Sequence, residues 1–170
     1  MRRKVRESNM DKGAWYVTEI KKILDSKGVE YEHLTHAPTP SALDTGITGW
    51  PLSSAIKALL VEGERTHTHY LLCIPGDRKL DIPKVKTVLG ERVVFLKPEI
   101  VLEKYGLVVG GVPPIGSLLE VRTYIDQRVL ENEIVDFCCG LSTDSIIMKA
   151  DVFASLEGNG IVDISKPVKT

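Results

Sequence analysis

Glutamine and asparagine are almost absent from this sequence of 170 residues: Gln127 is the only glutamine, and asparagine occurs only at positions 9, 132 and 159. Depletion of these thermolabile amides is one mark of heat-adapted proteins. Cysteine is scarce as well. Its three residues are odd in number, and two of them, Cys138 and Cys139, are adjacent, which does not fit a disulfide framework. We therefore expect a reducing, cytoplasmic environment.

Long apolar runs and an excess of one charge are also missing. No uncharged apolar run approaches the ~18 residues that a membrane span needs, so we expect no membrane partner. The basic N-terminus is not followed by the apolar segment of a signal peptide. The net charge of −1 excludes a protein that binds long stretches of phosphate backbone through an extended basic surface. Any contact with nucleic acid must therefore be local.

What is present indicates one globular domain, because 43% of the residues are hydrophobic and 26% are charged. We expect a flexible basic tail over residues 1–12 and a single domain over residues 13–170. Strand pairs joined by turns and interrupted by helices favour the α+β class with a mixed, mostly antiparallel sheet. The patterns predict helices at 14–27, 39–47, 82–89, 98–106 and 150–156, a helical turn at 51–54, and strands at 29–34, 55–60, 66–74, 92–96, 118–125, 134–138, 145–148 and 161–164.

Lys57 is the first candidate functional residue, because it lies inside the apolar run Ala55–Val61. A lysine on a mostly buried element must bring its ammonium to water, to an anion or to a polar ligand. The pattern by itself favours a strand lysine that extends to solvent. At the edge of an apolar pocket, the same group would suit a phosphate or an ester carbonyl.

The loop from Gly110 to Gly116, with the sequence G-G-V-P-P-I-G, is the second candidate. Glycines let a ligand approach the backbone closely, and prolines stiffen a loop. Free amides in such a loop bind carboxyl, carbonyl or phosphate oxygens. The spacing matches neither a phosphate-binding P-loop nor a dinucleotide-binding fingerprint. By itself, the loop also fits a tight connection between two elements.

The histidines and cysteines offer weaker candidates. His67, His69 and Cys73 share one face of the strand predicted at 66–74, as ligands of a metal would. Because polar residues surround the histidines, we interpret this stretch as an exposed polar strand rather than a zinc site. Cys138 and Cys139 are interpreted as small core residues. We expect neither a metal nor a cofactor.

The lysine in S-S-A-I-K-A-L-L-V at 53–61 and the V-G-G-V-P-P-I-G segment at 109–116 together resemble the YbaK/ProX family. Its members are free-standing relatives of the editing domain inserted in bacterial prolyl-tRNA synthetases. The resemblance extends from about Ile20 to Ile164. It includes the His36-x-Pro38 segment, the I-P-G-D-R-K-L stretch at 74–80, Tyr124-Ile125-Asp126 before a helical turn, and Cys139-Gly140-Leu141.

The resemblance implies a sheet rolled towards a barrel, flanked by helices, with the site between the lysine strand and the Gly/Pro loop. It also implies metal-free hydrolysis of the ester of a misacylated tRNA, mostly proline tRNA carrying alanine or cysteine, with a synthetase as a possible partner. Lys57 would hold the terminal phosphate or the ester region, and the loop would hold the carbonyl oxygen. The implied substrate-binding residues are Gly110, Gly111, Val112, Pro113, Pro114, Gly116, Thr39, His36 and Asp126.

Some of these implications are open. His36 is as readily structural as functional, and Asp126 is either a polar pocket residue or a structural carboxylate at the end of the sheet. Pro113 replaces a small polar residue of many relatives, so the loop has one N–H fewer, and Ser117-Leu118-Leu119 lacks the lysine pair of some relatives. The main alternative is a module that binds an aminoacyl-adenosine-like ligand or a synthetase without turnover. A general RNA-binding protein would require a more basic chain.

Overall fold

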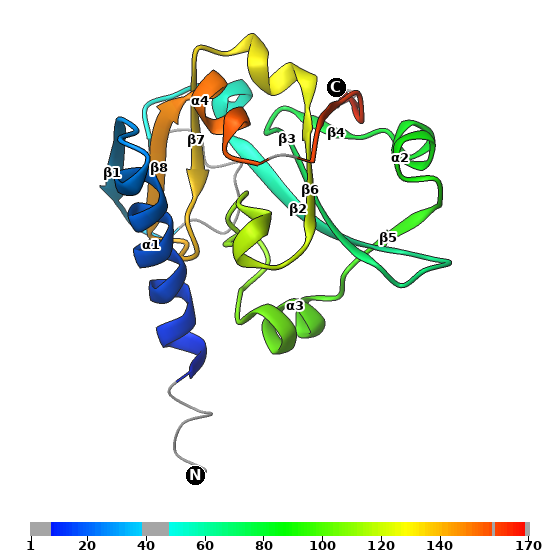
Figure 1. The fold of residues 1–170 in the computed structure, drawn as a ribbon, viewed down its shortest axis with the longest axis horizontal. Helices are drawn as coiled ribbons and strands as arrows, with labels where there is room; N and C mark the ends of the chain where they lie inside the picture. The colour runs from blue at the N-terminus through cyan, green and yellow to red at the C-terminus, as the bar shows by residue number, and fades with distance from the viewer. Residues whose placement is uncertain (1–7, 39–47, 158, 169–170) are drawn as a thin grey trace.

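A computed structural model describes residues 8–38, 48–157 and 159–168 of this chain (Figure 1). Four α-helices, three 3-10 helices and ten strands occur in these residues. The helices are α1 (Ser8–Ser26), α2 (Ile82–Leu89), α3 (Pro98–Tyr105) and α4 (Ala150–Ser155), and the 3-10 helices are η1 (Leu52–Ser54), η2 (Gly116–Leu118) and η3 (Gln127–Glu131). The strands are β1 (Tyr31–Thr35), β2 (Ile56–Gly63), β3 (His69–Pro75), β4 (Arg78–Leu80), β5 (Val93–Phe95), β6 (Arg122–Asp126), β7 (Ile134–Cys138), β8 (Asp144–Lys149), β9 (Ile161–Val162) and β10 (Ser165–Pro167).

The described strands form three sheets. One is antiparallel with the order β1-β8-β7, a second pairs β10 with β4, and the largest has the order β5-β2-β3-β6-β9. In the largest sheet, β2 pairs antiparallel with β3 and β5, whereas β6 pairs parallel with β3 and β9. The predicted α+β class with a mixed, mostly antiparallel arrangement is confirmed.

The sheets do not close into a barrel in the part of the chain that is described. Strands β2 and β7 approach each other, but one isolated parallel bridge, between Ala55 and Asp136, joins them. Beyond this bridge no ladder joins β2 and β7 among the described residues. The interruption leaves part of the edge of β2 without a neighbouring strand, and the candidate site described below lies there.

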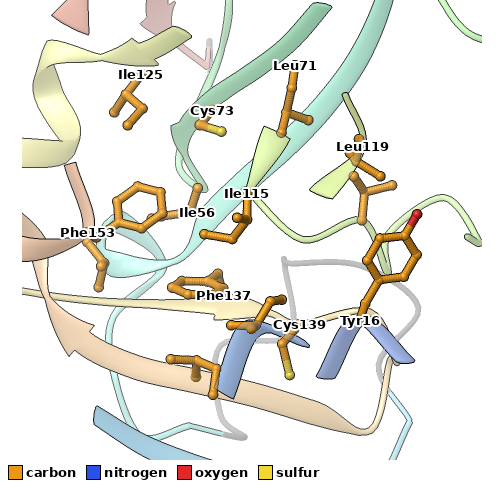
Figure 2. Close-up of a cluster of buried hydrophobic side chains, with 14 of the residues drawn as sticks. Tyr16, Ile56, Leu71, Cys73, Ile115, Leu119, Ile125, Phe137, Cys139 and Phe153 are labelled. Atoms are coloured by element: carbon orange, nitrogen blue, oxygen red, sulfur yellow. The ribbon is translucent and has the colours of Figure 1, made fainter. Parts of the chain in front are cut away.

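Apolar side chains on opposite faces of β2 and β3 enter two separate cores, as alternation along a strand requires. Leu71 and Cys73 pack into the larger core together with α1, α4 and the three-stranded sheet. Leu72 and Ile74 pack into a smaller core with α2. Figure 2 shows the larger core, where it labels Tyr16, Ile56, Leu71, Cys73, Ile115, Leu119, Ile125, Phe137, Cys139 and Phe153.

Helix α1 packs directly against the turn that joins β7 and β8. A Cβ atom on Gly140 would lie 2.6 Å from the Cβ of Tyr16, and one on Gly13 would lie 2.8 Å from the main-chain oxygen of Gly140. These two glycines therefore allow the close approach that places Tyr16 in the core, where its hydroxyl donates to the main-chain oxygen of Tyr105.

Most elements agree with the sequence predictions. The hairpin of β2 and β3 and the helix at 82–89 are confirmed. Helix α1 begins at Ser8, so it includes residues 8–12 of the predicted tail. The strand predicted from Leu118 begins at Arg122, because Leu118 and Leu119 belong to a 3-10 turn with bonds to Ile115 and Gly116. The helix predicted at 39–47 lies outside the described residues.

The predicted polar strand at 66–74 is wrong in its first three residues. The carboxylate of Glu91 accepts hydrogen bonds from the amides of Arg65 and Thr66, which holds this segment as a turn. Strand β3 therefore begins at His69, whose side chain is only 10% exposed and contacts the hydroxyl of Tyr105 and the carboxylate of Glu62. His69 is thus part of a buried polar contact and not of an exposed strand face.

No helix among the described residues is long and apolar enough to cross a membrane.

Candidate active site

A cavity of about 510 Å³ lies beside the open edge of β2. Lys57 lines this cavity together with Gly110 and Val112 of the Gly/Pro loop. Its described wall consists of Ile56, Lys57, Ala58, Leu59, Leu60, Phe95, Leu96, Pro98, Val101, Val109, Gly110, Val112 and Cys138. This wall is mostly apolar and contains no carboxylate and no imidazole. Such a site binds a small, largely apolar group and orients it with a few polar contacts.

The backbone of β2 forms one wall of the cavity. Strand β2 pairs with β3 from Ile56 to Glu62 but with β5 only from Val61 to Gly63. The main-chain oxygen of Leu60 accepts a bond from the amide of Leu96, so the polar groups of Leu60 point away from β3. Because these directions alternate along an antiparallel strand, the N–H and C=O of Ala58 also point away from β3, into the gap. Five consecutive residues of β2 line the cavity for this reason.

The Gly/Pro loop forms another part of the cavity wall. Pro113 and Pro114 have no N–H, and the amide of Gly111 donates to the main-chain oxygen of Val108 at 2.8 Å. The N–H groups of Gly110 and Val112 make no such bond among the described residues, and these two residues line the cavity. Gly110 has φ 91°, a conformation that favours glycine. Of the loop residues from Gly110 to Pro114, two therefore have amides without a main-chain partner among the described residues.

Gly116 serves a packing role at the end of the same loop. A Cβ atom there would lie 1.6 Å from Oγ1 of Thr123 and 2.9 Å from the main-chain oxygen of Val121. Its missing side chain allows the loop to pack directly on β6. Gly111, Pro113, Pro114 and Gly116 are buried and are absent from the described cavity wall, so they shape the loop behind the wall.

The Lys57 ammonium donates a hydrogen bond to the main-chain oxygen of Arg78 at 2.5 Å. Its side chain is half-buried, and this burial lowers its pKa, while the nearby carboxylate of Asp77 acts in the opposite direction. An ammonium has three donors, so two remain available for a ligand. Lys57 is thus a cation held at the wall of a largely apolar cavity.

The remaining expected site residues do not line the cavity in the described part of the chain. His36 accepts a hydrogen bond at Nε2 from the hydroxyl of Ser145 at 2.8 Å, and its Nδ1 donates to the main-chain oxygen of Ala37 at 2.7 Å. Asp126 is fully buried, and its carboxylate accepts bonds from the amides of Arg128 and Ile164. These bonds fix the ends of β6 and β9. Thr39 lies outside the described residues.

Sequence reasoning missed the part of the wall from Phe95 to Val101, and it misplaced Cys138. Cys139 is a core residue as predicted, but Cys138 lines the cavity. Adjacent residues of a strand point to opposite faces, and this signal would have placed one of the two thiols outside the core. The Cys138 thiol donates to the main-chain oxygen of Leu141 at 2.9 Å, and burial raises its pKa to about 11. It is therefore a neutral thiol at physiological pH and a poor nucleophile.

The family model of the aminoacyl-tRNA editing domain matches residues 36–156, which include β2, the Gly/Pro loop and every described residue of the cavity wall. The chain belongs to the aminoacyl-tRNA editing domain family. The family resemblance expected from Lys57 and the loop is thereby confirmed. Members of this family act on aminoacyl-tRNA, and the family is associated with prolyl-tRNA synthetase.

Two curated proteins are similar to this editing domain in sequence. YwhH of Bacillus subtilis is 32% identical over 98 residues, which are 58% of this chain and 62% of YwhH. The proline–tRNA ligase of Fervidobacterium nodosum is 26% identical over 141 residues, which are 81% of this chain and 23% of the ligase. The chain thus spans less than two thirds of either relative.

Solved structures share the fold. The protein APE2540 superposes with a TM-score of 0.78 at 24% identity, covering 86% of this chain and 99% of that one. A protein described as a trans-editing enzyme for prolyl tRNA synthetase superposes with a TM-score of 0.75 at 22% identity, covering 89% and 97% of the two chains. At these identities the likeness concerns the fold alone.

Proposed function

We propose that this editing domain is a trans-acting deacylase that hydrolyses the ester of a misacylated tRNA, with alanine- or cysteine-charged proline tRNA as its substrates. The observation that carries the proposal is that a lysine and two loop amides, which have no main-chain partner among the described residues, line one small, mostly apolar cavity. Family membership and the similarity to a proline–tRNA ligase support the same substrate class.

The two amides have the chemistry that ester hydrolysis needs. When water attacks the ester carbonyl, negative charge develops on the carbonyl oxygen, and preorganised N–H donors stabilise that charge. Gly110 and Val112 supply two such donors from a loop stiffened by Pro113 and Pro114. The rigid loop needs little reorganisation as the reaction proceeds. The water and the ester are held in place by the cavity wall, and positioning alone supplies a large part of the rate.

Lys57 binds the phosphate or ester region at the 3′ end of the tRNA in this proposal. Its ammonium has two donors besides the one used by Arg78, and its position in a largely apolar wall strengthens its attraction for an anion. The described wall offers no carboxylate or imidazole as a general base. As water adds to the ester carbonyl, the bond between the carbonyl carbon and the ribose oxygen breaks, and the proton released by the water reaches the departing ribose oxygen through the neighbouring ribose hydroxyl or through solvent.

Hydrolytic editing explains why a small cavity is useful. A synthetase pocket discriminates against a smaller amino acid by only ~1–3 kcal/mol of binding free energy, because the smaller side chain still fits the pocket and loses only the contacts of a missing methylene group. A second site that admits the small amino acid and not the correct one supplies the missing discrimination. The volume of about 510 Å³ and the apolar wall are compatible with a small side chain together with the terminal ribose.

A binding module without turnover is the second candidate function. The absence of a titratable acid or base, other than Lys57 and the neutral thiol of Cys138, in the described wall favours it. A deacylation assay separates the two functions. Purified protein is incubated with alanyl- and cysteinyl-tRNA specific for proline and with correctly charged prolyl-tRNA. Loss of the ester from a mischarged tRNA supports the deacylase, whereas tight binding of the intact substrate without hydrolysis supports the binding module.

A further inference from the structure

We infer that the open edge of β2 is a binding site for the free α-ammonium group of the aminoacyl moiety, with main-chain carbonyl oxygens as its acceptors. This inference rests on the proposed function and specifies its substrate class: esters of amino acids with an unblocked α-amino group. Acyl groups that lack this donor, or that carry it acylated, are predicted to be poor ligands.

The first step is the polarity of the two walls. The loop presents N–H donors from Gly110 and Val112, and β2 presents its free edge to the same cavity. On that edge the Leu60 oxygen accepts a bond from the Leu96 amide, whereas the Ala55 amide donates to the Leu52 oxygen and the Ala55 oxygen accepts from the Gly76 amide. One isolated bridge joins this end of β2 to Asp136. Between Ala55 and Leu60, the carbonyl oxygens of Ile56 and Ala58 point away from β3 and pair with no described strand. The cavity thus has N–H donors on the loop, and on the edge of β2 it has carbonyl acceptors beside the N–H of Ala58.

The second step is the cost of leaving an ammonium unpaired. An α-amino group has an ordinary pKa of about 7.7–8.0, so most of it is charged at neutral pH. A buried charge without hydrogen-bond partners is strongly unfavourable. The described wall contains no carboxylate that could pair with the ammonium, and Lys57 is itself a cation. The carbonyl oxygens of Ile56 and Ala58 are therefore acceptors in the described wall whose direction the strand fixes.

The third step is complementarity. An aminoacyl ester has an acceptor, its carbonyl oxygen, on one side of the α-carbon and a donor, its ammonium, on the other. The oxygen fits the amides of the loop and the ammonium fits the carbonyls of β2. Unpaired main-chain groups at a sheet edge are costly unless something satisfies them, and the substrate satisfies both walls at once. The side chain of the amino acid then lies against the apolar residues of the cavity.

The experiment compares four acyl groups on the same proline tRNA: alanyl, N-acetylalanyl, lactyl and propionyl. Each enzymatic rate is divided by the uncatalysed hydrolysis rate of that ester, because an α-ammonium activates an ester even without a protein. We expect the rate enhancement for the alanyl ester to exceed that for the propionyl ester by about 10- to 100-fold, as for loss of a charge-assisted hydrogen bond. The lactyl ester, which keeps a neutral donor, is expected to be intermediate.

Binding is measured separately with stable amides of 3′-amino-3′-deoxyadenosine that carry the alanyl or the propionyl group. We expect the alanyl amide to bind about 10-fold more tightly near pH 6.5, with the difference decreasing as the α-amino group loses its proton. Propionyl is smaller than alanyl, so weaker binding cannot result from a steric clash.

Equal binding of the two amides, or equal rate enhancements for alanyl and propionyl esters, would overturn the inference while leaving the deacylase intact. Preferential binding of the alanyl amide without hydrolysis of any ester would overturn the proposed function but not the ammonium site. If neither amide binds, the ammonium site is rejected as well.

Discussion

Lys57 and Arg78 are joined by a hydrogen bond of 2.5 Å from the lysine ammonium to the main-chain oxygen of the arginine. This bond fixes the cation at the turn between β3 and β4. Replacing Lys57 with alanine is predicted to lower kcat/KM for alanyl-tRNA by about 10- to 100-fold, because a charge-assisted contact to the substrate is lost. Lys79→Ala is the matched control, since Lys79 is a neighbouring exposed lysine of β4. An equal loss in both variants would contradict a specific role for Lys57.

The amide of Val112 is the subject of the second prediction. Val112→Pro removes one of the two free N–H groups of the loop, and a loss of about 10²- to 10³-fold in kcat is expected, as for removal of an oxyanion donor. Val112→Ala is the control because it keeps the N–H and only shortens the side chain. Single-turnover deacylation measures both variants, and circular dichroism verifies their folding. If the alanine variant loses as much activity as the proline variant, the side chain matters rather than the amide.

Cys138 lines the cavity as a neutral thiol, because burial raises its pKa to about 11 from the ordinary 9.0. This shift lowers its thiolate fraction at pH 7.5 roughly 100-fold, so alkylation by iodoacetamide is predicted to be slower than that of a free cysteine by about that factor. The modified protein is predicted to be inactive, since the adduct fills part of the cavity. Mass spectrometry and deacylation on the same time course test both points. Cys138→Ser should resist inactivation, and rapid alkylation of Cys138 would show that its thiol is ionised.

The carboxylate of Glu91 holds the turn between β2 and β3, and it makes the stability of the fold dependent on pH in the acidic range. Hydrogen bonds from the hydroxyl and the amide of Thr66, and a further bond from the amide of Arg65, lower the pKa of Glu91 to about 2. Burial acts in the opposite direction. A carboxylate with a lowered pKa stabilises the fold above its unfolded pKa, near 4.5, and this stability is lost as the pH falls towards 2. Glu91→Gln is predicted to be less stable than the natural protein at pH 7, with a difference that shrinks over this window.

Urea unfolding at pH 7, 4.5, 3 and 2.5 measures the Glu91 effect. Glu99→Gln, at an exposed position in the first turn of α3, is the control. A difference between Glu91→Gln and the natural protein that stays constant with pH would exclude the carboxylate charge as its source.

The pKa of Asp136 is shifted in the opposite direction to that of Glu91. Burial raises its pKa, and one carboxyl oxygen is buried without a hydrogen-bond partner, while the other accepts a bond from Thr48 at 3.0 Å. A raised pKa means that the stability contribution of Asp136 is full below its unfolded pKa, near 3.8, and is lost as the pH rises through the folded value. Asp136→Asn keeps the bond from Thr48 and is predicted to raise the thermal midpoint at pH 7 by about 2–4 °C. The gain should vanish below pH 3.8, and a gain that persists there would refute the electrostatic explanation.

Local patterns in the sequence were sufficient for most elements. The helix at 82–89 was predicted within its observed bounds, because Pro83 and Gly90 mark its two ends and Asp81 caps its first turn. The strand starts at 66 and 118 were wrong for one shared reason. In both places a tertiary or short-range hydrogen bond outweighs strand propensity: the Glu91 carboxylate holds Thr66 in a turn, and a 3-10 turn contains Leu118.

The candidate site was only partly predictable. Lys57 and the loop were found because an isolated lysine in an apolar run and a loop rich in glycine and proline are both unusual as sequence. Phe95 and Leu96 were not found, since an apolar residue at a cavity looks like an apolar residue in a core. The free carbonyl of Ala58 has no signature at all in the sequence, because every residue has a carbonyl group.

The α+β class could be predicted from the periodicity of the sequence, whereas the family and the two segments that meet at the cavity were predicted from a resemblance carried by the lysine segment and the Gly/Pro loop. The tertiary structure alone decided which polar groups are free. The amide of Gly111 is used by Val108 in a local turn of the folded loop, and whether the edge of β2 is covered by β7 depends on how distant segments pack. The polar chemistry of this cavity is largely main-chain chemistry, and main-chain groups acquire their individual roles only through folding.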